Sequence, residues 1–111
     1  MSEDRPEAVS PVIKAAPGID RLIHEPARYH IMAILYVIES ADFLFLMRQT
    51  GMTKGNLSSH MRRLEESGYI EVVKEFMMRK PHTMLKLTKK GRDAFREYSR
   101  SMKQLFNGLP S

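Results

Sequence analysis

A very short connection between two helix-forming segments is the feature that most restricts how this chain can fold. The segment Phe43–Thr50 is followed by Gly51, a residue type that commonly ends helices. Thr53, two residues later, is a preferred N-cap for a new helix. The next segment has apolar residues at i, i+4 and i+7, the spacing of one helix face: Leu57, Met61 and Leu64. We therefore predict two helices joined by a tight turn, the second ending near residue 67, before Gly68.

The outward side of this second helix carries no acidic residue until its far end. Polar, small and basic side chains occupy it: Lys54, Gly55, Asn56, Ser58, Ser59, Arg62 and Arg63. Glu65 and Glu66 follow only where the helix ends. A helix that enters a major groove about 12 Å wide must stand out from the protein body and present this kind of surface. The pattern predicts a helix-turn-helix unit of the type that binds DNA.

Other segments predict a first helix and two strands. The helix begins at Glu25 and Pro26, because proline is well suited to a first helical turn, and residues 40–42 end it. Residues 69–76 and 83–88 alternate between apolar and polar side chains, as half-buried strands do.

The connection between the strands and the end of the chain complete the predicted order. Residues 77–82 are polar and basic, and Pro81 disfavours pairing there. Phe43 is a candidate third short strand, and Thr88 is a natural N-cap for a last helix over residues 89–107. The order helix, helix, helix, strand, strand, helix predicts an α+β fold, mostly α, with a three-helix core and a β-hairpin.

Positive charge is concentrated in one part of the chain. The net charge is +5, from 18 Lys and Arg against 13 Asp and Glu. Residues 53–92 contain ten of the basic residues and four of the acidic ones, so the remainder is close to neutral. This unevenness is typical of a phosphate-binding face.

Length and composition exclude several classes of protein. The 111 residues suit one domain, and no apolar run is long enough to cross a membrane. Residues 1–4 are polar and acidic, unlike a signal peptide, so we expect a soluble cytoplasmic protein. The absence of cysteine excludes disulfides, thiolate catalysis and cysteine-based zinc sites. The histidines lack metal-ligand spacing and no catalytic motif is present, so we expect no metal, no cofactor and no enzymatic activity.

Four stretches follow one another in a recognisable order along residues 20–98: Leu22-Ile23-His24-Glu25-Pro26-Ala27-Arg28, Gly51-Met52-Thr53-Lys54-Gly55-Asn56-Leu57-Ser58, Leu64-Glu65-Glu66-Ser67-Gly68-Tyr69-Ile70 and Leu87-Thr88-Lys89-Lys90-Gly91-Arg92. In these stretches the chain resembles the winged helix-turn-helix transcriptional regulators of the MarR/ArsR-like group, especially the small archaeal and bacterial ones. The resemblance implies a homodimer that binds specific double-stranded DNA sequences. It further implies that recognition helices 53–67 enter successive major grooves and that wings 77–82 meet the flanking minor groove.

The expected DNA contacts follow from this resemblance and from the basic positions. They are Thr53, Lys54, Asn56, Ser58, Ser59, Arg62, Arg63, Arg79 and Lys80. Thr53 is foremost a helix cap, and an asparagine such as Asn56 can pair with adenine. Arg62 and Arg63 are suited to phosphates, and Arg79 and Lys80 to the minor groove. Lys89, Lys90 and Arg92 are further candidates for phosphate contacts.

Simpler interpretations of the same residues remain open at this point. Arg62 and Arg63 could pair with Glu65 and Glu66 on a solvated helix face. Asn56 could assist capping, and the basic hairpin tip could serve only solubility.

The last helix is longer than a winged-helix domain requires. Its apolar stripe must be covered, and a second copy of the chain is the simplest cover, with packing on the same subunit as the alternative. The predicted dimer interface comprises Tyr29, Met32, Tyr36, Phe95, Tyr98, Met102, Leu105 and Phe106. The predicted organisation is a flexible tail at residues 1–17, a DNA-binding domain at 18–88 and a dimerisation helix at 89–111.

A second class of function competes with DNA binding. A winged-helix fold can also serve as a protein-binding module within the transcription machinery, because fold alone does not determine function. The acid-free surface of residues 54–63 favours DNA. Larger MarR-like proteins hold small molecules beside their dimerisation helices; residues Tyr36, Phe43, Phe45 and Phe95 suit such a crevice and suit the core equally, so an effector stays open.

Overall fold

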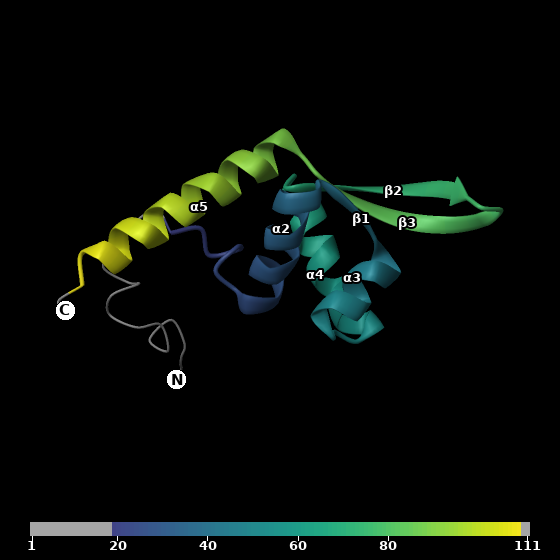
Figure 1. Cartoon of the computed structure of the whole chain (residues 1–111), viewed down its shortest axis with the longest axis horizontal. Helices are drawn as coiled ribbons and strands as arrows, with labels where there is room; N and C mark the ends of the chain where they lie inside the picture. The colour runs from purple at the N-terminus through teal and green to yellow at the C-terminus, as the bar shows by residue number, and fades with distance from the viewer. Residues whose placement is uncertain (1–18, 110–111) are drawn as a thin grey trace.

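A computed structural model describes residues 19–109, and the tail predicted at residues 1–17 lies outside the described residues. The described part contains four helices and three strands, labelled as in Figure 1. They are α2 (Pro26–Ile38), β1 (Ser40–Asp42), α3 (Phe43–Thr50), α4 (Lys54–Glu66), β2 (Ile70–Met77), β3 (Lys80–Leu87) and α5 (Lys89–Asn107). The predicted fold class, mostly helical with a hairpin wing, is confirmed.

Local capping signals define the helix ends. The Glu25 side chain accepts a hydrogen bond from the Arg28 backbone N–H (2.9 Å) at the start of α2. The Thr53 hydroxyl oxygen accepts one from the Asn56 N–H (3.1 Å) at the start of α4. Gly51 ends α3 with φ +73°, a left-handed conformation that glycine adopts without a Cβ clash.

The third strand lies at Ser40–Asp42, not at Phe43. It pairs antiparallel with β3, with Ala41 opposite Leu85, and the sheet order is β1-β3-β2. Phe43 instead begins α3, because the Asp42 carboxylate accepts a hydrogen bond from the Leu44 N–H (3.4 Å) and caps that helix. Residues 40–42 therefore end α2 as predicted but then join the sheet.

The hairpin is longer than the sequence predicted. Pairing continues through Phe76 opposite Pro81 to Met77 opposite Lys80, so the turn consists of Met78 and Arg79 alone. In a two-residue hairpin the pair that closes the turn exchanges hydrogen bonds and the next pair does not. Pro81 therefore needs no N–H toward β2, and β1 does not reach that part of β3. The predicted loss of pairing over residues 77–82 was wrong for this reason.

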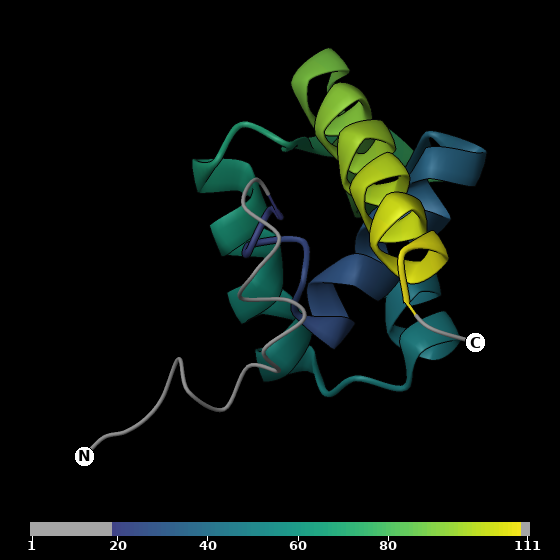
Figure 2. The same cartoon turned by 90° about the vertical axis from the view of Figure 1, so that its left-hand side faces the viewer.

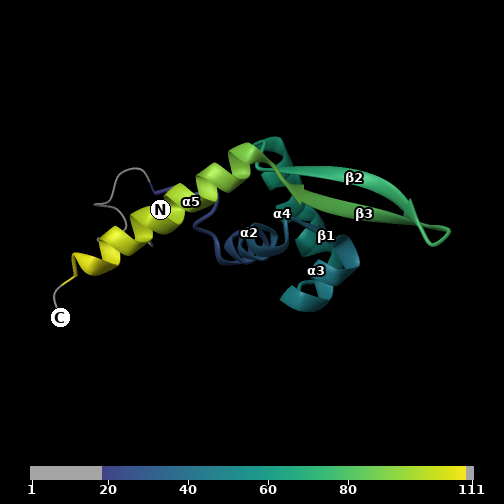
Figure 3. The same ribbon diagram turned by 45° about the horizontal axis from the view of Figure 1, so that its top comes forward.

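The core lies among α2, the inner faces of α3 and α4, and the proximal half of the sheet. Its fully buried side chains come from these elements and from the turn that precedes α2: Ile23, Ile31, Met32, Leu35, Leu46, Leu57, Leu64 and Leu85. Figure 2 shows α5 in front of the other helices. Figure 3 shows that β2 and β3 extend beyond the helices. No described helix is long and apolar enough to cross a membrane.

The start of α5 is fastened to the chain that follows α4. The Thr88 hydroxyl donates to the Gly68 carbonyl (2.6 Å), and its oxygen accepts from the Gly91 N–H (2.9 Å). Gly91 lies so close to Tyr69 that a Cβ at this position would overlap the Tyr69 carbonyl oxygen. The Tyr69 hydroxyl donates a hydrogen bond to the Asp20 carboxylate. The pKa of Tyr69 is raised to about 12, mainly by burial and additionally by this hydrogen bond.

Candidate nucleic-acid interface

The turn between α3 and α4 is held by short-range hydrogen bonds. The Thr50 hydroxyl donates to the Leu46 carbonyl (2.7 Å), and its oxygen accepts from the Met52 N–H (3.3 Å). Leu57 and Leu64 are fully buried on the inner face of α4. These contacts set the direction of α4 relative to the core and leave its opposite face outside.

The outward face of α4 contains most of the residues that the sequence predicted to contact DNA. Gly55, Ser59 and Arg62 follow one another at i, i+4 and i+7 and are all exposed. Exposed residues also flank this line: Thr53, Lys54, Asn56 and Arg63. Ser58 is half-buried, so it lies at the border of the face.

Neither arginine of α4 takes part in an ion pair with another described residue. Arg62 and Arg63 therefore do not form the pairs with Glu65 and Glu66 that the sequence left open. Asn56 contributes only its backbone N–H to the Thr53 cap, and its exposed side chain makes no hydrogen bond within residues 19–109. Within the described part of the chain, nothing occupies these polar groups, so they are available to an external ligand.

The wing presents a second basic group at its tip. Arg79 and Lys80 are exposed and form no ion pair with another described residue, whereas Glu75 is paired with Lys86 (3.0 Å) farther along the hairpin. Met78 and Arg79 have φ of +51° and +65°. A two-residue turn with positive φ at both positions usually contains glycine or asparagine. With methionine and arginine instead, its backbone is strained by about 1–2 kcal/mol per residue.

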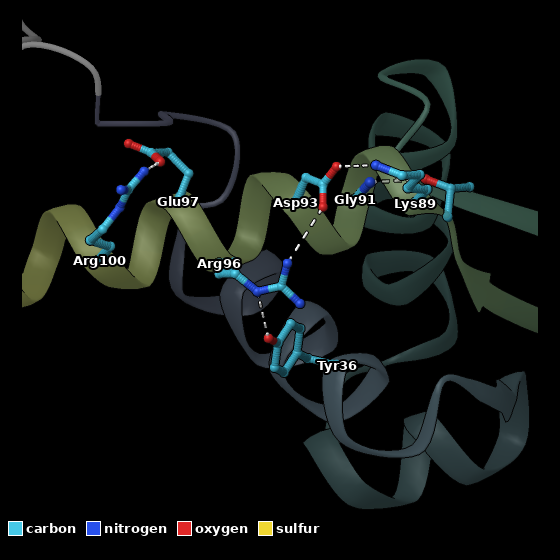
Figure 4. Close-up of polar contacts among 8 residues, drawn as sticks. Tyr36, Lys89, Gly91, Asp93, Arg96, Glu97 and Arg100 are labelled. Carbon is cyan, nitrogen blue, oxygen red and sulfur yellow. Dashed lines mark hydrogen bonds and ion pairs between the residues drawn. The ribbon is translucent and has the colours of Figure 1, made fainter.

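The basic residues at the start of α5 are engaged within the chain. Lys89 donates a hydrogen bond to the Asp93 carboxylate (2.8 Å; dashed line in Figure 4). This hydrogen bond is the main cause that lowers the pKa of Asp93. Arg92 lies 3.7 Å from the Glu39 carboxylate and over the Tyr36 ring, and Arg96 donates to the Tyr36 hydroxyl (3.2 Å). The Lys89–Asp93 pair has the i,i+4 spacing of one helix face, whereas the partners of Arg92 and Arg96 lie outside α5, where no local pattern indicates them.

A buried arginine connects α2 to α4, a contact that sequence reasoning missed. Arg28 is only 8% exposed; its guanidinium donates to the Leu22 carbonyl (2.7 Å) and lies 3.1 Å from the His60 Nδ1 atom. Burial is the main cause that lowers the pKa of Arg28, and Glu25 partly offsets it. His60 is thereby directed inward, away from the outward face of α4. Arg28 and His60 are 32 residues apart, so no local pattern marks their contact.

The predicted dimer residues lie along α2 and α5, with very different exposure. Met32 is fully covered by its own chain, and Phe95 and Tyr98 are buried in an aromatic cluster with Tyr29 and Tyr36. Half-buried or exposed surface remains at Tyr29, Tyr36, Met102, Leu105 and Phe106. Packing on the same subunit thus accounts for the first half of α5 but not for its end.

A cavity of about 540 Å³ opens between the start of α2 and the middle of α5. It is lined by His24, Pro26, Tyr29, Tyr98, Ser99 and Met102. Tyr36, Phe43 and Phe45, which the sequence suggested for a crevice, pack against the core instead. Among residues 19–109 no three His, Asp or Glu side chains lie together as metal ligands would.

Known proteins share both the sequence pattern and this geometry. Over 89 residues the chain is 35% identical to the protein MJ0432 of Methanocaldococcus jannaschii, spanning 80% of this chain and 97% of that one. A transcriptional regulator homologue from Pyrococcus horikoshii superposes with a TM-score of 0.78 at 27% identity, over 90% of this chain and 94% of that one.

A more distant structure agrees on the fold. YusO of Bacillus subtilis superposes with a TM-score of 0.69 at 19% identity, over 86% of this chain and 70% of that one. Residues 27–106 match the family described as winged helix DNA-binding domain, so the predicted resemblance to winged-helix DNA-binding proteins is confirmed. The chain therefore belongs to the winged helix DNA-binding domain family.

Proposed function

We propose that the protein is a homodimeric transcriptional regulator that binds specific double-stranded DNA sequences. Helix α4 enters the major groove, and the wing meets the adjacent minor groove. The observation that carries this proposal is the exposed face of α4 from Lys54 to Arg63, which is free of acid and whose cations form no ion pair with another residue of the described range 19–109. The basic wing tip extends the same charge beyond the helices (Figure 3).

The end of α5 supports the dimeric part of the proposal. Phe106 is 73% exposed and Leu109 is also exposed, although α5 is amphipathic along its whole length. Apolar surface of this kind is usually covered by a partner, and most soluble homo-oligomers are two-fold symmetric. Two-fold symmetry would place the two α4 helices one helical turn of DNA apart, about 34 Å.

Binding of the full chain to labelled DNA duplexes tests whether the basic residues of the wing contact phosphates. Duplexes selected from a random pool should bind tightly, with affinity that falls as salt rises. Replacing both Arg79→Ala and Lys80→Ala should weaken binding and reduce the salt slope by about one to two phosphate equivalents. The matched control, Arg100→Ala with Lys103→Ala on the far part of α5, removes the same charge and should leave the slope unchanged. Equal slopes for both double variants would contradict the role given to the wing.

A second comparison separates sequence recognition from phosphate binding. Asn56→Ala should cost about 1–3 kcal/mol on the selected duplex and much less on random duplexes, because it removes a base contact. Arg62→Ala should weaken both by similar factors. If the protein itself binds selected and random duplexes equally, sequence specificity is refuted. If the protein binds no duplex in a salt-dependent way, the DNA-binding proposal is refuted and a protein-binding module is the better interpretation.

A further inference from the structure

The tip of the wing exposes large apolar side chains together with its basic pair. Met78 is 92% exposed and Phe76 is 73% exposed, and Met77 is partly exposed between them. Solubility alone would favour polar residues at such an exposed tip.

The position of these side chains follows from the strand register. Phe76 lies opposite Pro81 on the same face of the hairpin as Val72 and Leu85, the face that covers the core nearer the body. The hairpin extends past the helices (Figures 1 and 3), so beyond the polar pair Lys74 and Thr83 this face presents Phe76 where no described element covers it. Met78 occupies the two-residue turn itself, at the narrowest point of the wing.

Charge around these side chains indicates the partner. Arg79 and Lys80 lie next to them, and the nearby acid, Glu75, is already neutralised by Lys86 at 3.0 Å. A minor groove about 6 Å wide is too narrow for a two-stranded ribbon, but side chains of a turn can enter it while cations contact the phosphates at its rim. Methionine and phenylalanine are among the side chains that separate stacked base pairs from the minor groove and kink the duplex.

We propose that Met78, supported by Phe76, is an apolar wedge that inserts between base pairs in the minor groove and bends the bound DNA. This inference rests on the proposed function, because it assumes that the wing reaches the duplex. It adds that each wing unstacks a base step rather than only contacting the surface of the groove. The strained turn at Met78 and Arg79 holds the wedge side chain at the tip.

Energy transfer between dyes at the two ends of a selected duplex tests the wedge. The parent protein should shorten the distance between the ends. The double variant Phe76→Ser with Met78→Ser should lose most of that shortening and bind about tenfold more weakly, while the salt slope stays the same because no charge is removed. Val37→Ser is the control, since Val37 is equally exposed (79%) on α2 and should change neither quantity.

The outcomes distinguish the wedge from the proposed function. Tight, salt-dependent binding without bending, or bending that the double variant retains, overturns the wedge and leaves the regulator proposal standing. Absence of salt-dependent binding by the parent protein overturns both. Vesicles of anionic phospholipid provide a further arm: if the parent protein binds them, the double variant does not, and DNA stays straight, the tip is a membrane contact and the wedge is refuted.

Discussion

Gly55 lies on the central line of the outward face of α4, in the first turn of the helix. A Cβ at this position would meet nothing within 4 Å, so the fold itself does not require glycine there. Glycine in a helix costs about 1 kcal/mol relative to alanine. A close approach of another molecule to the helix backbone would explain why the smallest residue occupies this position.

Gly55→Ala should therefore change stability and binding in opposite directions. The variant should be up to about 1 kcal/mol more stable in urea denaturation. It should bind the selected duplex several-fold more weakly, because the added methyl group separates α4 from the groove. Gly108→Ala, at the end of α5 where a Cβ has ordinary neighbours, is the control and should bind as the parent does. Unchanged duplex affinity of Gly55→Ala would show that α4 does not make a close contact at this point.

At the scale of elements, α5 depends on a close approach that only glycine permits. A Cβ on Gly91 would overlap the Tyr69 carbonyl oxygen, and it would lie 2.8 Å from the carbonyl carbon and 3.0 Å from Leu87 Cδ1. Backbone atoms cannot move aside as a flexible side chain can, so α5 must shift away from the turn after α4. Gly91→Ala should lower the free energy of unfolding by about 1–3 kcal/mol. Urea denaturation measures this change, with Gly55→Ala as the control, because that variant adds the same methyl group but is expected to raise the free energy of unfolding. If Gly91→Ala were as stable as the parent or more stable, α5 would not be held against Tyr69.

Elements with their own local signals were predictable, and those that depend on distant partners were not. The helix ends at Gly51, Thr53 and Thr88 follow from residue types that act within one turn. By contrast, Ser40–Asp42 is a strand only because β3, more than forty positions later, pairs with it. The pairing of Pro81 depends likewise on which edge of β3 is open.

The candidate site divides in the same way. The helical period was enough to place Lys54, Asn56 and Arg62 on one exposed face. It could not indicate that Arg28 directs His60 inward, or that Arg92 is held by Glu39, because both contacts join separate elements. The alternation of residues 69–76 likewise could not predict that Phe76 is exposed. Alternation shows which side chains share a face of the strand, but not how far the helices that cover that face extend.

Across the whole molecule, the two proposed interfaces lie at opposite ends. The wing and the end of α5 extend in opposite directions from the core (Figure 1). A substitution at the end of α5 can therefore change oligomeric state without touching α4 or the wing. Phe106 suits this purpose, since it is 73% exposed and contributes little to its own subunit.

Phe106→Asp should convert the proposed dimer to monomers, because it places a charge in the apolar surface that we propose a second copy covers. Sedimentation equilibrium of the full chain measures this, with Val37→Asp as the control: Val37 is 79% exposed on α2, so that variant should remain dimeric. The monomer should unfold at nearly the parent's urea concentration. It should bind a duplex with two half-sites at least about tenfold more weakly, since linked binding is lost, and a single half-site about as well as the parent. A dimeric Phe106→Asp, or a monomeric Val37→Asp, would place the interface elsewhere than at the end of α5.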